Sequence, residues 1–222
     1  MFGANEDKLA LVGTFISKAT KVPTSVSGVA ISEDSGHTWR ISQINVPTGY
    51  TRYGAFPSEK VWYVTSGIWA DSAAAVSGEH RLSRGYSVTK SGLKYSAPVR
   101  STNETLSATD WFGSVQKTTD GGLTWSEVFV IPSTDLLYFN QISCSSESQC
   151  VAVAEGDTAS GGYRVAAYLT TDGGATWTQT LDAADVGLTG AYMSSPTEGW
   201  LAGTTKSRGE VEVAWPFIFQ LL

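Results

Sequence analysis

The chain has 222 residues, a formal net charge of -6, 41% hydrophobic residues and 23 glycines. The acidic balance argues against nucleic acid as a partner, because phosphate backbones are bound by clustered Lys and Arg. No apolar run is long enough for a membrane-spanning helix, and residues 1–8 lack the basic head and apolar centre of a signal peptide. We therefore expect no nucleic-acid partner and no membrane span, and we interpret the first residues as lying inside a domain, which favours a longer natural protein.

Short apolar or alternating runs follow one another along the chain, and none shows a long helical spacing. Such runs, separated by Gly, Pro, Ser and Asp, predict an all-β protein. The first run, residues 9–16, is almost entirely apolar and predicts a strand in the interior of a sheet. The predicted strands are 9–16, 27–31, 40–46, 51–56, 61–67, 127–131, 139–144, 150–156, 163–169, 178–181, 188–193 and 199–203, with a last one at 210–220 that Pro216 interrupts.

Two cysteines, Cys144 and Cys150, flank a polar tip between two of these strands. Residues on either side of a hairpin tip can meet at disulfide distance, so we predict a disulfide; two free thiols at a turn are the alternative. A disulfide would indicate an extracellular, secretory or other oxidising compartment. Asn103 begins an N-glycosylation sequon, which is meaningful only in a eukaryotic secretory protein.

One eight-residue phrase occurs three times, at residues 32–39, 118–125 and 170–177. Its shared pattern is Ser/Thr-x-Asp-x-Gly-x-Thr-Trp. Repetition of this kind indicates repeated structural units. The residues that we single out in the three copies are Ser32, Asp34, Gly36 and Trp39, then Thr118, Asp120, Gly122 and Trp125, and finally Thr170, Asp172, Gly174 and Trp177.

The residue types of the phrase predict a tight β-hairpin. Glycine reaches the positive φ that such turns need. The Asp carboxylate can accept hydrogen bonds from N–H groups across its own turn, and the preceding hydroxyl can join this network. The Trp begins the returning strand, where its ring is expected to pack beneath the turn. One Asp per copy does not supply the oxygen ligands of a calcium loop, so we expect no metal site.

The three phrases resemble Asp boxes, also called BNR repeats, which occur in sialidases, sortilin-type receptors, some endoglucanases and photosystem assembly factors. This resemblance implies a β-propeller of four-stranded antiparallel blades. It also implies that the box lies in the hairpin between the third and fourth strands of a blade, away from the ligand face. A fold that hosts many activities does not select one of them.

The spacing of the phrases predicts the number of units. Asp34 and Asp120 are much farther apart in sequence than Asp120 and Asp172, whereas a blade typically takes about 40–50 residues. We therefore interpret residues 71–110 as an insertion with its own hairpin or as a degenerate blade. Residues 1–222 then form a single propeller domain of about four to five blades, or a segment of a larger propeller, whose open ends would favour self-association.

Two classes of function fit these motifs. The favoured one is a non-catalytic recognition or scaffolding module for protein or glycan, without a cofactor, because no P-loop, dinucleotide fingerprint or nucleophile elbow is present. The alternative is a truncated or degenerate sialidase-like glycoside hydrolase, for which the resemblance implies clustered arginines, an acid/base Asp and a Tyr–Glu pair. Trp62 and Trp200 are expected in the core, and the candidate ligand-face residues are Tyr53, Trp69, Trp111, Glu155, Asp157 and Tyr163.

Overall fold

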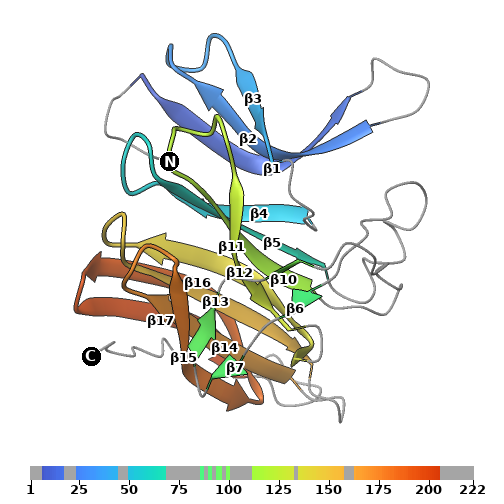
Figure 1. The fold of residues 1–222 in the computed structure, drawn as a ribbon, viewed down its shortest axis with the longest axis vertical. Helices are drawn as coiled ribbons and strands as arrows, with labels where there is room; N and C mark the ends of the chain where they lie inside the picture. Colours follow the sequence, from blue (N-terminus) through green and yellow to red (C-terminus); the bar gives the residue numbers. More distant parts are fainter. Residues whose placement is uncertain are drawn as a thin grey trace.

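A computed structural model describes residues 7–17, 24–44, 50–68, 86–87, 90–91, 94–96, 99–100, 112–132, 135–157 and 163–205 of the chain. These residues form antiparallel β-strands and no α-helix, which confirms the all-β prediction (Figure 1). None of their elements is a helix of the length and apolar character needed to cross a bilayer. Trp69, Asn103, Trp111 and the strand predicted at 210–220 lie outside the described residues.

Most described strands belong to four sheets that follow one another along the chain and stack on each other (Figure 1). The first sheet contains β1 (Leu9–Ser17), β2 (Thr24–Ser32) and β3 (Arg40–Gln43). The second contains β4 (Tyr50–Ala55), β5 (Trp62–Ile68), β10 (Phe112–Thr118) and β11 (Ser126–Ile131). The third contains β12 (Leu137–Cys144), β13 (Cys150–Asp157), β14 (Tyr163–Thr170) and β15 (Thr176–Ala184), and the fourth contains β16 (Val186–Ser195) and β17 (Glu198–Thr205).

Short strands from the long connection between β5 and β10 form further pairs. β6 (Tyr86–Ser87) pairs with β9 (Val99–Arg100), and β7 (Lys90–Ser91) pairs with β8 (Lys94–Ser96). β8 also pairs with β15 and so extends the third sheet. β5 and β10 pair directly along their whole length, so residues 69–111 connect neighbouring strands of one sheet.

The second and third sheets share one plan, in which the order of the four main strands, β4-β5-β10-β11 and β12-β13-β14-β15, follows the chain. Their first strands, β4 and β12, contact each other, β4 also contacts β1, and β12 contacts β16. β4, β12 and β16 each carry a bulge at the same relative position, at Arg52, Asn140 and Thr189. Because a bulge bends and twists a strand, the three strands are shaped alike where the sheets meet.

Apolar layers fill the spaces between neighbouring sheets. Alternation along a strand sends successive side chains to opposite layers: Trp62 and Val64 of β5 pack toward the first sheet, whereas Tyr63 packs toward the third. The layer between the second and third sheets is the richest in aromatic rings, and its Phe129 contacts the rings of Phe139, Tyr168 and Trp177. Trp62 is buried as expected, but Trp200 of β17 is only half-buried.

The apolar strand β1 differs from its prediction. β1 stands at an edge of the first sheet in the described strand order, and its Leu11 is 56% exposed. Ala10 and Val12 of β1 pack on the layer shared with the second sheet, while the other face has no described sheet against it. The prediction of an interior strand from the apolar run was therefore wrong, because only one of the two faces of β1 is covered.

Candidate functional site

The three repeated phrases form hairpins with one hydrogen-bond network. In the third copy, the Asp172 carboxylate accepts the backbone N–H of Thr176 at 2.9 Å and its hydroxyl at 2.6 Å. The Thr170 hydroxyl donates to Asp172 at 2.9 Å and accepts the N–H of Gly174, also at 2.9 Å. The equivalent bonds are present around Asp34 and Asp120. The predicted roles of the carboxylate and of the preceding hydroxyl are confirmed.

Two successive residues in each hairpin have positive φ. They are Gly121 and Gly122 in the second copy and Gly173 and Gly174 in the third, with φ between 71° and 87°. In the first copy Ser35 takes the first of these positions at φ 56°, where a side chain is strained. Hydrogen bonds from its N–H and its hydroxyl to Asp7, at 2.8 and 2.7 Å, hold it there.

Hydrogen bonds within the turns lower the pKa of all three carboxyl groups. The hydroxyl and then the N–H of Thr38 lower the pKa of Asp34 to about 2. Bonds led by that from the Thr118 hydroxyl lower the pKa of Asp120. For Asp172, burial acts to raise the pKa, but the bonds within its turn outweigh it and the pKa is lowered. Each carboxylate therefore serves its own hairpin as a charged acceptor.

The three box tryptophans differ in burial. Trp177 is fully buried and stacks on Phe129 of the preceding sheet, with 5.3 Å between ring centroids. Trp125 is half-buried and donates from Nε1 to Oγ of Ser42 in the preceding sheet at 2.9 Å. Trp39 donates from Nε1 to the carbonyl oxygen of Gly36 in its own turn at 3.0 Å but is 43% exposed, so its ring lies against the turn as predicted, whereas the expected burial was wrong for Trp39. Each packed ring is covered by the sheet before its own, and no described sheet precedes the first.

Cationic side chains link the second and third box hairpins to the sheets before them. Lys117 of the second sheet donates from Nζ to the carbonyl oxygen of Gly173 at 2.7 Å. Arg40 of the first sheet donates to the equivalent carbonyl oxygen, that of Gly121, at 3.4 Å. The Ser42 hydroxyl also donates to the carbonyl oxygen of Gly122. The box hairpins therefore hold neighbouring sheets together.

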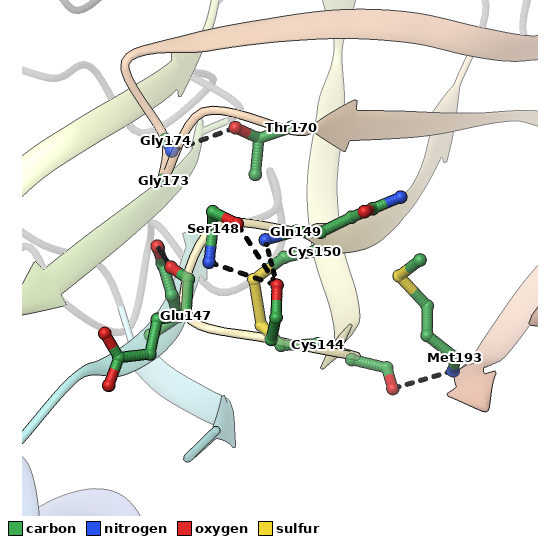
Figure 2. Close-up of a disulfide and its surroundings, with 12 residues drawn as sticks. Cys144, Glu147, Ser148, Gln149, Cys150, Thr170, Gly173, Gly174 and Met193 are labelled. Atoms are coloured by element: carbon green, nitrogen blue, oxygen red, sulfur yellow. Dashed lines mark hydrogen bonds between the residues drawn. A yellow bond between two sulfur atoms is a disulfide. The ribbon is translucent and has the colours of Figure 1, made fainter. Parts of the chain in front are cut away.

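A disulfide between Cys144 and Cys150 closes the β12–β13 hairpin, which confirms that prediction. Figure 2 shows it beside the third box hairpin, where the N–H of Gly173 donates to the carbonyl oxygen of Ser148 at 2.8 Å. The hydroxyl of Tyr63, from the second sheet, donates to the carbonyl oxygen of Glu147 in the same tip at 2.6 Å. The closed tip thus contacts both its own box and the neighbouring sheet.

The strand ends opposite the boxes carry a cluster of aromatic and charged side chains, at the boundary of the second and third sheets. Tyr138 of β12 is opposite Glu155 of β13 and donates its hydroxyl to that carboxylate at 2.6 Å. Arg52, at the bulge of β4, lies 5.0 Å from the centroid of the Tyr138 ring and 5.5 Å from that of Tyr53. We call Arg52, Tyr53, Tyr138 and Glu155 the inter-sheet cluster.

Two of the predicted ligand-face residues, Tyr53 and Glu155, thus belong to the inter-sheet cluster. Sequence reasoning missed Tyr138 and the role of Arg52. The disulfide offers only a partial signal, because counting back along the strands from the pair of Cys144 and Cys150 gives the cross-strand partners as far as the bulge at Asn140. A count without the bulge at Asn140 would place Phe139, not Tyr138, opposite Glu155.

The electrostatic environment keeps the Tyr138 phenol protonated. Burial is the largest cause that raises its pKa, followed by the hydrogen bond to Glu155, and the charge of Arg52 opposes the rise. At neutral pH Tyr138 is therefore a neutral hydrogen-bond donor.

The other two ligand-face candidates that the structure describes, Asp157 and Tyr163, lie at the same end of the third sheet. Asp157 of β13 is directly opposite Tyr163 of β14, whose ring is exposed. Next to Tyr163, Arg164 makes two 2.8 Å hydrogen bonds to the Asp182 carboxylate, which raise its pKa. Arg164 is therefore engaged within the sheet.

No metal-binding group of three or more His, Cys, Asp or Glu occurs among the described residues. Comparisons of the sequence with protein-family models and with curated proteins find no match.

Proposed function

We propose that the protein is a non-catalytic recognition module of the β-propeller type, in which the repeated phrases are Asp boxes. The arrangement of the sheets supports this proposal: they stack in chain order, their first strands meet, and those strands share a bulge. Three hairpins with the same hydrogen-bond network also support it, because such repetition is typical of blades. The binding face then lies at the strand ends opposite the boxes.

The inter-sheet cluster is the observation that carries the proposed function. It combines aromatic faces, a guanidinium and a carboxylate at one boundary between sheets, with the exposed ring of Tyr163 at the same end. Aromatic faces offer large apolar contact at low entropic cost, and the polar groups orient a ligand. Hydroxyl-rich glycans and protein loops are the ligand classes that match this combination.

The pair of Tyr138 and Glu155 is also the specific observation that favours the second candidate function, a sialidase-like glycoside hydrolase. A tyrosine nucleophile is activated by a neighbouring base, and the Glu155 carboxylate accepts the Tyr138 hydroxyl at 2.6 Å. Arg164, one of the arginines that could hold a substrate carboxylate, is engaged by Asp182. The engagement of Arg164 supports the non-catalytic function over the hydrolase.

The disulfide supports a place in an oxidising compartment. Cysteine pairs persist in secreted and extracellular proteins and are rare in a reducing cytosol. We therefore place the proposed module in the extracellular space or the secretory route, where proteins and glycans of cell surfaces are accessible.

A glycan array combined with a panel of fluorogenic glycosides tests the proposal. We expect binding without turnover, and we expect Tyr53→Ala and Tyr163→Ala to weaken binding by about tenfold or more, as for aromatic anchors. Leu123→Ala is the matched control, because Leu123 is exposed on the second box hairpin, at the opposite end. An absence of glycan binding in the folded protein would restrict the ligand class to proteins.

Two results would overturn this assignment. Turnover that is lost in Glu155→Gln would establish the hydrolase. Binding that persists in both tyrosine variants but is lost in Leu123→Ala would move the ligand site to the box end.

A further inference from the structure

The three box hairpins define equivalent positions in the first three sheets. The first residue of each box is paired with a residue of the neighbouring strand: Ser32 with Leu9, Thr118 with Trp62, and Thr170 with Cys150. Two residues further along these neighbouring strands, Leu11, Val64 and Ala152 are therefore equivalent. In the same way Trp39 is equivalent to Trp125 and Trp177.

In the second and third sheets this equivalent face is covered by the sheet before it. Val64 and Trp62 pack in the layer shared with the first sheet, and Ala152 and Trp177 pack in the layer shared with the second. We call this face, which carries Trp62 and Val64 in the second sheet, the leading face of a sheet, and the opposite face the trailing face. The described contacts between neighbouring sheets thus join the leading face of one sheet to the trailing face of the sheet before it.

The leading face of the first sheet has the same apolar character but is exposed. Leu11 is 56% exposed, Ile41 52% and Trp39 43%. Leu11 is paired with Ala30, and Ala30 with Ile41, so an apolar row crosses all three strands. Trp39 lies two residues before Ile41 and faces the same side. Contiguous exposed apolar side chains on a soluble protein mark an interaction surface.

The trailing face of the fourth sheet is the complementary surface. Ala191, Met193 and Leu201 point toward the third sheet, so Tyr192 and Trp200 point away from it. Tyr192 is 60% exposed and stacks on Trp200, its cross-strand partner, with 5.8 Å between ring centroids. The two end sheets therefore expose the two kinds of face that pack on each other inside the chain.

We propose that the leading face of the first sheet binds the trailing face of the fourth sheet of a second copy of this chain. The contact continues the sheet-to-sheet packing of the molecule, with β1 of one copy facing β17 of the other. β1 is equivalent to β5 and β13, and β17 is likewise the second strand of its sheet. Because two different surfaces meet, the association is head-to-tail, and it closes into a ring or grows into a chain of copies.

Analytical ultracentrifugation over a series of protein concentrations tests the proposal. We expect wild-type assemblies that grow with concentration, and a dissociation constant raised by about tenfold or more in either Ile41→Lys or Tyr192→Lys, because each buries a charge at the contact. Leu123→Lys is the control, since Leu123 is exposed on the second box hairpin and belongs to neither of the two proposed contact faces. Circular dichroism establishes that each variant is folded.

A mixture of the two variants distinguishes head-to-tail from symmetric association. Ile41→Lys keeps its trailing face and Tyr192→Lys keeps its leading face, so an equimolar mixture should form dimers and nothing larger. A wild-type protein that stays monomeric at all concentrations would overturn the proposal. So would a variant that associates as well as the wild type, or a mixture that stays monomeric while the wild type associates.

Discussion

The three box tryptophans allow a graded test of how neighbouring sheets stabilise each other. Trp177 is fully buried and stacks on Phe129, Trp125 is half-buried, and Trp39 is 43% exposed. The three residues occupy the same position in the same motif, so a substitution by alanine changes the same local hairpin in each case. Trp39 also donates to the carbonyl oxygen of Gly36 within its turn; beyond that bond, a difference in the free energy of unfolding reports the covering sheet.

The burial of each ring determines the expected magnitude. Truncating a buried aromatic side chain costs about 3–5 kcal/mol, which includes the cavity that remains. Because the Trp177 Nε1 is buried and has no hydrogen-bond partner in the described part of the chain, this cost arises from packing alone. For Trp39→Ala we expect about 1 kcal/mol or less, mainly from the lost bond between Nε1 and the carbonyl oxygen of Gly36.

Thermal and urea unfolding at low protein concentration provide the assay. For a domain of this size, about 1 kcal/mol corresponds to about 2–4 °C in Tm, so Trp177→Ala should lower Tm by at least about 6 °C. Trp177→Phe is the matched variant, because it keeps the stack on Phe129 and removes the unpaired N–H, and its effect should be clearly smaller. Equal losses for Trp39→Ala and Trp177→Ala, or a neutral Trp177→Ala, would refute the packing argument.

Three further predictions follow from the hairpins and their links. Cys144→Ser should lower the free energy of unfolding by about 2–3 kcal/mol, as expected for a short disulfide loop, and reductant should produce the same loss in the wild type but no further loss in the variant. Because the native pKa of Asp34, about 2, is below the ordinary value of 3.8, its stabilisation is complete above pH 3.8 and is lost as the pH falls toward 2. Acid unfolding curves of Asp34→Asn should therefore be flatter over that range than those of the wild type, and curves that coincide would contradict the role of the carboxylate. Lys117→Met should cost about 1–2 kcal/mol by removing the bond to the carbonyl oxygen of Gly173, and amide hydrogen exchange should increase at the third box, whereas unchanged exchange there would show that the link is not stabilising.

The hairpins were predictable from the sequence because their bonds are local. Asp34, Asp120 and Asp172 accept hydrogen bonds from residues up to four positions away, so the pattern of residue types is sufficient. The same is true of Cys144 and Cys150, which flank a single tip. In these places sequence neighbours are also the physical partners.

The inter-sheet cluster and the exposure of Trp39 were not predictable for a common reason. Both depend on which sheet lies against which, and on contacts between residues far apart in the chain, such as Arg52 and Tyr138. The bulge at Asn140 shifts the register by one residue and selects Tyr138 as the partner of Glu155. A bulge of this kind has no strong sequence pattern. The identity of a motif thus gave its local shape, whereas burial required the neighbouring sheet.

The cationic links to the box carbonyls have an evolutionary consequence. Arg40 and Lys117 attach to main-chain oxygens of the next hairpin, and every amino acid provides such an oxygen. A duplicated unit can therefore be accepted by its neighbour without a matching mutation in the partner. This polar link to a duplicated unit needs only a hairpin of the same shape, which the short motif already encodes.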